Sequence, residues 1–448
     1  MNNKHLWTTE SSTRAGTYPW LLFAFLAIVF FFIYHDLPLA PRVAGDYNPD
    51  LDQLVTTVSQ GHDARRIALF SLAAVAIGIL VRYPNNNRLT MVDPLGWVVL
   101  AFPAWAFLSA LWADDLSQNL TRLAGFAILC IAAVAVVRRL SLKEVVVWSS
   151  LSTAAYLSIG VFVELLYGTL QPFTPGYRFA GSLHPNGQGI NCGILLLSSI
   201  AGADLEERWR KYFWSFAIIA LAFLLLSGSR TALAAVVLAT ITYLVAVRSR
   251  RTTLAVAYCS AMIVAFVLSL AAAGFIPHLK DAVLMGRDDP ESVDTFAGRT
   301  AIWKDVGPYI RQSPILGYGY SGFWTPAHMN AISDLEEWGV GNGHSAYIDY
   351  LLTLGAVGLL AYVLSLVLGI RRAFRCYQVT RSPDYAFCGS ILVFCTIDSV
   401  FESGIADPSL LMFLWMVVII WLAFVPLREP FPVSEGNPSS LNHALFLG

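Results

Sequence analysis

The chain has 448 residues, of which 56% are hydrophobic and 13% charged, and its formal net charge is −1. A soluble domain needs a polar surface, so this composition excludes a soluble globular protein and predicts that a lipid bilayer is the main solvent. The nearly neutral net charge also gives no sign of the strongly basic composition that is typical of nucleic-acid-binding domains.

Apolar stretches long enough to cross about 30 Å of hydrocarbon recur along the chain. We predict about twelve transmembrane helices, at residues 19–34, 65–81, 94–111, 121–137, 145–167, 187–203, 211–227, 230–247, 253–275, 344–370, 385–404 and 409–427. The expected fold is therefore an all-α polytopic membrane protein. Because Lys4 and Arg14 precede the first apolar stretch, cleavage of that stretch as a signal peptide stays open.

Lysine and arginine gather in alternate loops. The basic groups are Arg82 with Arg88, Arg138 with Arg139 and Lys143, Arg208 with Arg210 and Lys211, Arg248 with Arg250 and Arg251, and Arg371 with Arg372, Arg375 and Arg381. Cytoplasmic loops of membrane proteins carry an excess of such residues, so we expect both termini to be cytoplasmic.

One connection is long, and this topology places it outside. Within it, Ile302 and Val306 belong to an apolar stripe between Arg299 and Arg311, which predicts a short amphipathic helix on the membrane surface. The expected divisions are helices 1 to 9 over 1–276, the outer loop over 277–343, helices 10 to 12 over 344–427, and a cytoplasmic tail over 428–448.

Three predicted helices run from outside to inside, and polar residues mark their starts. They are Arg178, His184 and Asn186 at the sixth helix, Ser229 and Arg230 at the eighth, and His344 and Tyr347 at the tenth. Helix N-termini expose N–H groups and partial positive charge, so together with arginines they predict a site for a dense anion such as diphosphate. The alternatives are that Arg178 and Arg230 are interfacial anchors and that Asn186 and Ser229 are only helix caps.

His344 is the candidate general base, because a helix N-terminus disfavours the charged imidazolium and leaves a neutral proton acceptor. An interfacial histidine bonded to a loop carbonyl is the alternative. Tyr347 lies one turn later, where it could orient the ring, stack on a sugar or belong to the aromatic belt.

Two acidic residues fall inside predicted spans, Glu164 near the outer end of the fifth helix and Asp398 in the outer half of the eleventh. Charges are costly in hydrocarbon, so we expect each to pair with an arginine at the outer face; a direct role at the substrate is the alternative. No group of histidines, cysteines and carboxylates has metal-ligand spacing, which predicts that neither metal nor another cofactor is needed.

Several short motifs follow one another in a characteristic order. They are Leu111–Asp115, Arg178–Asn186, Ser227–Thr231, Gly298–Trp303, Pro314–Gly319, and His344–Tyr347 before a helix that contains Gly355 and Gly358. With this order and spacing around one long loop, the chain resembles the O-antigen ligase and Wzy-type polymerase superfamily.

The resemblance implies an all-helical GT-C type fold that takes a glycan from undecaprenyl diphosphate at the periplasmic face of the bacterial inner membrane, without metal. It also implies that His344 is the general base and that Arg230 and Arg299 stabilise the departing diphosphate, with Arg178 as a further candidate. Ser345 departs from the family pattern, in which asparagine often follows the histidine.

The resemblance favours a polymerase of an exopolysaccharide, whose partners would include a chain-length regulator and a flippase. One alternative is a ligase that transfers the glycan to lipid A-core. Another is a transporter or flippase, but carriers place polar groups near the bilayer midplane, whereas the polar clusters of this sequence lie at one face.

Overall fold

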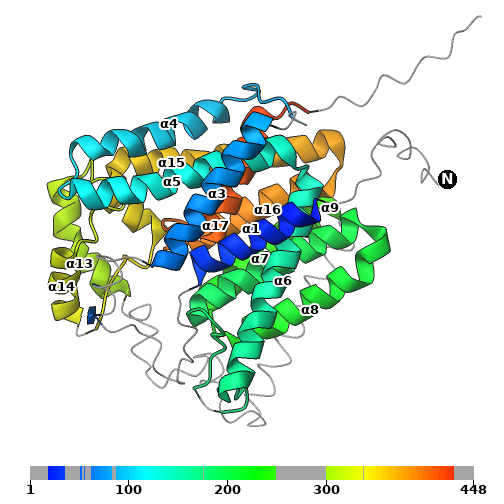
Figure 1. Ribbon diagram of the computed structural model, residues 1–448, viewed down its shortest axis with the longest axis horizontal. Helices are drawn as coiled ribbons and strands as arrows, with labels where there is room; N and C mark the ends of the chain where they lie inside the picture. The colour runs from blue at the N-terminus through cyan, green and yellow to red at the C-terminus, as the bar shows by residue number, and fades with distance from the viewer. Residues whose placement is uncertain are drawn as a thin grey trace, which may run out of the picture.

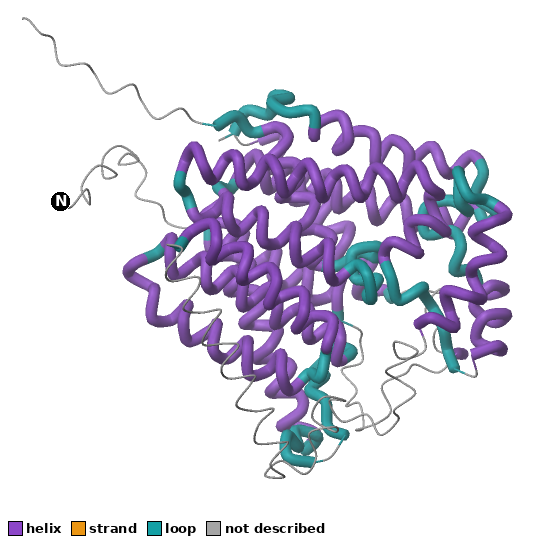
Figure 2. Tube along the Cα trace, turned by 180° about the vertical axis from the view of Figure 1, so that it is seen from behind, coloured by secondary structure: helices purple, strands orange, loops and turns teal. Residues whose placement is uncertain are grey.

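The computed structural model describes residues 19–35, 51–52, 55, 62–82, 87–174, 176–248, 299–336 and 338–427. All regular structure in these ranges is helical (Figures 1 and 2), which confirms the all-α class. The α-helices are α1 (Trp20–Tyr34), α3 (Asp63–Arg82), α4 (Leu95–Leu108), α5 (Leu116–Arg139), α6 (Leu142–Tyr167), α7 (Pro185–Leu205), α8 (Arg210–Leu226), α9 (Arg230–Val247), α13 (Arg299–Gln312), α14 (Pro326–Glu336), α15 (Ala346–Thr380), α16 (Pro383–Asp398) and α17 (Leu410–Phe424).

Most predicted spans coincide with these helices to within a few residues, whereas the span at 253–275 lies outside the described residues. Six helical segments are long and apolar enough to cross a membrane, namely Asp63–Arg82, Leu116–Arg139, Leu142–Tyr167, Glu207–Leu226, Arg230–Val247 and Ala346–Thr380. Shorter apolar helices occupy Trp20–Tyr34, Leu95–Leu111 and Leu410–Phe424. The chain is therefore a helical membrane protein by length and composition.

Local sequence signals set the helix ends. Asp115 caps α5 by accepting a hydrogen bond from the N–H of Gln118, and Ser141 forms a reciprocal capping box with Glu144 at the start of α6. At the other end of α6, Gly168 adopts a left-handed conformation with φ 69°, which favours glycine and stops the helix.

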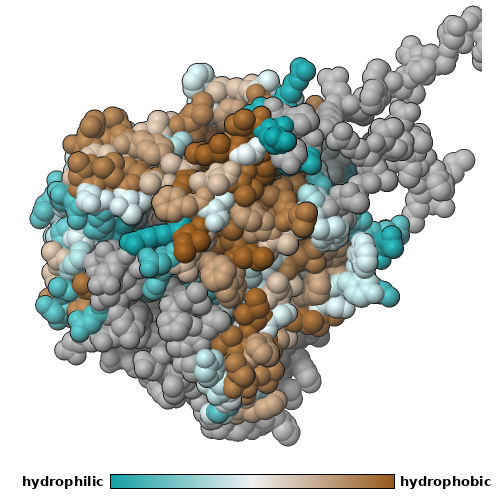
Figure 3. Space-filling view, in the orientation of Figure 1, coloured by the Kyte–Doolittle hydropathy of each residue, from teal (hydrophilic) through white to brown (hydrophobic). Residues whose placement is uncertain are grey.

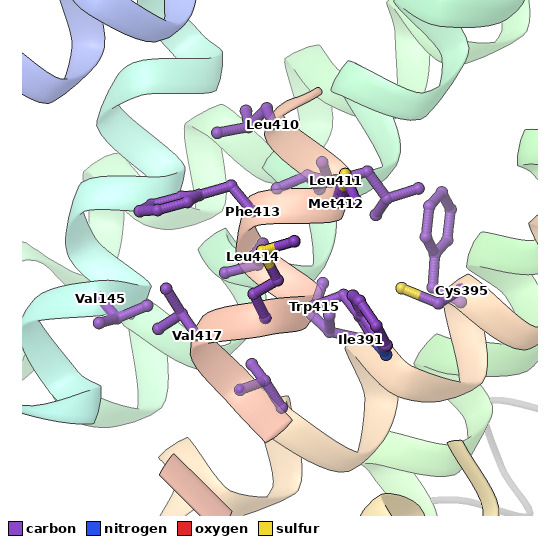
Figure 4. Packing of buried hydrophobic residues seen from close by; sticks show 14 of the residues in the cluster. Val145, Ile391, Cys395, Leu410, Leu411, Met412, Phe413, Leu414, Trp415 and Val417 are labelled. Atoms are coloured by element: carbon purple, nitrogen blue, oxygen red, sulfur yellow. The ribbon is translucent and has the colours of Figure 1, made fainter. Parts of the chain in front are cut away.

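Helix α17 lies in the centre of the bundle (Figure 4). All its residues from Leu410 to Ala423 are buried, as expected for a helix that is apolar on every side. Its Phe413 ring packs on Phe30 of α1 at 4.3 Å between centroids, and its Trp415 packs on Tyr362 of α15 at 5.6 Å. This aromatic packing connects α1, α15 and α17 in one core.

Helices α13 and α14 form a small outer subdomain at one end of α4, α5 and α15 (Figure 1). Its core comprises Ile302, Val306, Phe323, Trp324, Met329, Ile332 and Val340, together with Leu352 from α15. Hydrophilic residues gather at this edge of the molecule, whereas hydrophobic residues cover much of the bundle (Figure 3). The predicted amphipathic helix corresponds to α13, but its Ile302 and Val306 face this protein core and not a membrane surface.

Helix α15 is broken at Gly355, where φ is 65° and ψ is −168°. The segment 314–318 crosses this break: Ala356 N–H donates to the carbonyl oxygen of Pro314, and Tyr318 N–H donates to that of Leu352, both at 2.9 Å. A Cβ atom at position 355 would overlap the carbonyl oxygen of Ile315. The close approach and the positive φ both require glycine. Because the backbone is not helical at Gly355, the single helix predicted over 344–370 consists of two pieces.

Candidate functional site

The starts of α7, α9 and α15 lie at the same end of the bundle. A Cβ atom on Gly189 of α7 would lie 2.6 Å from the Cβ of Ser229, so the first turns of α7 and α9 are in contact. At the start of α15, Ala346 N–H donates to the carbonyl oxygen of Glu402 at 3.1 Å, while the Glu402 carboxylate bonds Asn186 of α7. The three helix starts singled out in the sequence are thus neighbours.

A continuous chain of polar side chains crosses this end. Arg178 donates from Nη2 to Oδ1 of Asn186 at 2.7 Å, and Asn186 donates from Nδ2 to Oε1 of Glu402 at 2.8 Å. The same Oε1 accepts a hydrogen bond from Nη2 of Arg299 at 2.5 Å, which is also an ion pair. Residues 178, 186, 299 and 402 therefore form one network, although they come from four segments of the chain.

Arg178 is held on its loop by further contacts. Its Nε donates to the carbonyl oxygen of Ser227 at 3.0 Å, and its side chain lies against Gly228, whose φ is 61°. Glu164 accepts the N–H groups of Ala180 and Gly181 at 3.0 and 2.7 Å and also the hydroxyl of Tyr177. Glu164 thus fixes the loop that carries Arg178 through backbone amides, where an ion pair with an arginine was expected.

His344 lies immediately before α15 in a left-handed conformation with φ 47°, which is uncommon for a residue other than glycine. Its N–H donates to Oδ1 of Asn342 at 3.0 Å. The preceding residue, Gly343, accepts a hydrogen bond from the indole of Trp303 at 2.8 Å and donates to Asp349 at 2.9 Å. The histidine is therefore carried on a loop whose backbone is fixed from both sides.

Burial lowers the pKa of His344 to about 4, and the positive charge of Arg299 acts in the same direction. Both effects disfavour the imidazolium. His344 is consequently neutral at pH 7, the protonation state that a general base needs.

Arg230 and Ser229 occupy the start of α9. Ser229 caps the helix by accepting the N–H of Ala232 at 3.4 Å. Arg230 is the first helical residue, is half-buried, and makes no hydrogen bond or ion pair with any other residue that the structure describes. Its guanidinium is therefore available to an anion, in contrast to those of Arg178 and Arg299.

The other residues singled out in the sequence mainly contact protein. The Nδ1 atom of His184 accepts the N–H of Asn186 at 3.2 Å and caps α7, and the hydroxyl of Tyr347 donates to the carbonyl oxygen of Thr396 at 2.9 Å. Asp398 ends α16, is buried, and accepts the N–H of Glu402 through its backbone carbonyl at 2.9 Å. Asp398 thus lies just behind the network, where the charges of Arg299 and Glu402 act on it.

Two acidic residues at this end of the bundle were not predicted from the sequence as members of the site. Glu402 joins Arg299 to Asn186, and buried Asp349 accepts the N–H of Gly343, the indole N–H of Trp324 and the hydroxyl of Ser403. The available signal was position: Glu402 follows Asp398 by four residues, and Asp349 follows His344 by five. Within the described ranges, no group of three or more histidine, cysteine, aspartate or glutamate residues is arranged to hold a metal ion.

Residues 215–363 match the family model of the O-antigen ligases. Over this region the chain is similar to the O-antigen ligases. No curated protein matches the sequence. The matched region includes Arg230, Arg299 and His344, whereas Asn186 and Glu402 lie outside it. The match confirms the resemblance to the O-antigen ligase and Wzy-type superfamily and, at that general level, implies a glycosyltransferase acting on lipid-linked glycans in a membrane.

Proposed function

We propose that the protein is a polymerase that joins undecaprenyl-diphosphate-linked oligosaccharide repeat units into an exopolysaccharide or O-antigen-like chain. The match to the O-antigen ligase family model supports the reaction class. The observation that carries the proposal is the arrangement of His344 and two arginines. His344 is a neutral histidine on which the positive charge of Arg299 acts. Arg299 in turn belongs to one hydrogen-bond network with Arg178.

In this reaction a hydroxyl oxygen of the acceptor sugar attacks the anomeric carbon of the donor sugar. His344 accepts the hydroxyl proton, the new C–O bond forms, and the bond between the anomeric carbon and the diphosphate oxygen breaks with its electron pair on the diphosphate. Direct attack inverts the anomeric centre. No electrons are exchanged with another reagent, so the step needs no redox cofactor, and in this proposal arginines instead of a metal ion balance the charge of the leaving diphosphate.

The arginines stabilise the charge that develops on the leaving diphosphate. Arg230 is available to an anion, whereas Arg299 is positioned by Glu402 and Arg178 by Asn186. Guanidinium groups bind phosphate oxygens in a bidentate manner, and donors placed before the reaction favour the transition state most. Asn186, His184 and Ser229 then support the site as helix caps and positioning groups.

The remaining parts of the proposal concern location and partners. The GT-C type architecture with twelve transmembrane helices, the loop over 277–343, the cytoplasmic termini and a site at the periplasmic face of the inner membrane together form the proposed topology. A flippase would supply the lipid-linked donor at that face, and a chain-length regulator would limit elongation.

A ligase that transfers the glycan to lipid A-core is the second candidate, because the matching family model describes O-antigen ligases. Polymerase and ligase share donor chemistry and differ in the acceptor. A transporter is disfavoured by the position of the polar groups, which gather at one end of the bundle.

The deciding experiment supplies purified protein with a lipid-diphosphate-linked repeat unit, either alone or with lipid A-core. A ladder of longer glycans from the repeat unit alone supports the polymerase, whereas transfer only to lipid A-core supports the ligase.

His344→Ala should lower the rate by about 10² to 10⁴, the usual contribution of a general base. Arg299→Lys should recover part of the activity that Arg299→Ala loses, because lysine keeps the charge but not the bidentate geometry. Unchanged elongation by His344→Ala would refute the mechanism.

A further inference from the structure

Three tryptophans surround the loop that carries His344, and they use their indole N–H groups differently. Trp303 donates to the carbonyl oxygen of Gly343 and Trp324 donates to Asp349, each at 2.8 Å. The indole of Trp338 makes no hydrogen bond to any other residue in the described part of the chain. Two tryptophans therefore hold the loop, while the third keeps its donor available.

Trp338 is also the aromatic side chain that packs against the proposed base. Its ring centroid lies 5.7 Å from that of His344, with 46° between the ring planes. The residue is half-buried, because part of the ring packs on the core of the outer subdomain. The ring is thus supported by protein, next to His344, and still partly exposed.

Tyr347, the aromatic residue expected beside the histidine, points elsewhere. Its hydroxyl donates to the carbonyl oxygen of Thr396 on α16, and its ring packs on Tyr362 at 5.8 Å. Tyr347 therefore packs into the bundle, which leaves Trp338 as the described aromatic ring in contact with His344.

We propose that Trp338 is a binding residue for the acceptor glycan, whose pyranose ring stacks on the exposed part of the indole while a sugar oxygen accepts the indole N–H. A pyranose has a face of C–H groups and a rim of hydroxyls, which suits a side chain with an apolar face and one polar donor. The sugar is the acceptor because a general base must reach the hydroxyl that it deprotonates, and Trp338 contacts that base.

This inference rests on the proposed function, and its test compares the kinetics of the two substrates. In wild-type protein, the KM values for the lipid-linked donor and for a defined acceptor oligosaccharide are measured separately. Trp338→Ala should raise the acceptor KM about tenfold or more and change the donor KM less than about twofold. Trp338→Phe keeps a ring but loses the donor, so its acceptor KM should rise only a few-fold. Trp303→Phe is the matched control; it loosens the His344 loop and should lower kcat with little change in acceptor KM.

A second measurement needs no variant. Oxidative footprinting of tryptophans in wild-type protein, read by mass spectrometry, should show that acceptor protects Trp338 and leaves Trp324 unchanged. An unaltered acceptor KM in Trp338→Ala, equal increases of both KM values, or absence of protection would overturn the inference. If wild-type protein elongates neither the repeat unit nor lipid A-core, the proposed function fails instead, and the two failures are therefore distinguishable.

Discussion

Glu402 joins two basic parts of the site through a single carboxylate oxygen, which accepts from both Arg299 and Asn186. Glu402→Gln keeps the size of the side chain and removes its charge. A hydrogen bond to a charged group contributes about 1.5 to 3 kcal/mol, so both Arg299 and the Asn186–Arg178 pair should be held less firmly. We expect kcat to fall about tenfold or more in a glycan-elongation assay.

The control for this change is Glu207→Gln. Glu207 is exposed, lies beyond the opposite end of α7, and pairs with Arg210 at 3.5 Å. Because exposed ion pairs contribute little, this variant should elongate glycans at the wild-type rate. Equal rates for the two variants would mean that the charge of Glu402 does not position the arginines.

If His344 is the general base, the acidic side of the pH–rate profile should fall off only at unusually low pH. With its pKa lowered to about 4, the histidine stays neutral well below its ordinary value of 6.5, so kcat/KM should decline only as pH falls towards 4. A bound diphosphate offsets the charge of Arg299, so the corresponding limb of kcat should lie at higher pH. Rate profiles at low and saturating donor concentration check this, with activity remeasured at pH 7 to confirm that the protein survived. A kcat/KM limb at 6.5 or above would contradict the environment described for His344.

The sequence singles out His344 and Arg230 as candidate site residues because a motif surrounds each of them, and their roles stay predictions. It gives no such signal for a residue whose contacts depend on the folded structure. The Asn186–Glu402 bond joins positions 216 residues apart. Trp338 is close to His344 in sequence, but both lie in an irregular loop, where no helical or strand period predicts which side chains meet.

Among the elements, the break in α15 makes the sharpest prediction. Gly355→Ala introduces a Cβ at positive φ and in overlap with the carbonyl oxygen of Ile315, so the segment 314–318 must move. We expect a clearly lower thermal unfolding midpoint in detergent and a loss of activity. Gly78→Ala in α3 is the matched control: no atom lies within 4 Å of its Cβ, and alanine favours helices over glycine by about 1 kcal/mol. A midpoint for Gly355→Ala equal to that of Gly78→Ala would show that the crossing does not constrain α15.

The length of an apolar stretch predicts where a helix lies better than it predicts the internal geometry of that helix. The stretch at 344–370 is apolar throughout, and its hydrophobic pattern gives no sign that the backbone departs from helical φ at Gly355. Helix α14 was not predicted, because its short sequence mixes polar and apolar residues. The helix is stabilised by the core that it shares with α13.

For the whole molecule, the proposed topology places α14 outside the cell membrane and the turn after α7 inside. Asp334 and Glu207 are exposed at these two places and suit substitution by cysteine. In intact spheroplasts, a membrane-impermeant maleimide should label Asp334→Cys and should label Glu207→Cys only after permeabilisation. The parent protein, labelled in parallel, corrects for native cysteines. The reverse pattern would invert the topology and move the site to the cytoplasm.

The crossing of residues 314–318 at the break in α15 also limits how the outer subdomain could be exchanged between related enzymes. Leu352 belongs to the subdomain core, and the backbones of Leu352 and Ala356 bond the crossing segment, so the boundary between subdomain and bundle lies inside α15. A chimera joined at position 344 would separate groups that fold together. One joined after Ala356 would keep them together, which makes the first turns of α15 part of the unit that a chimera should transfer.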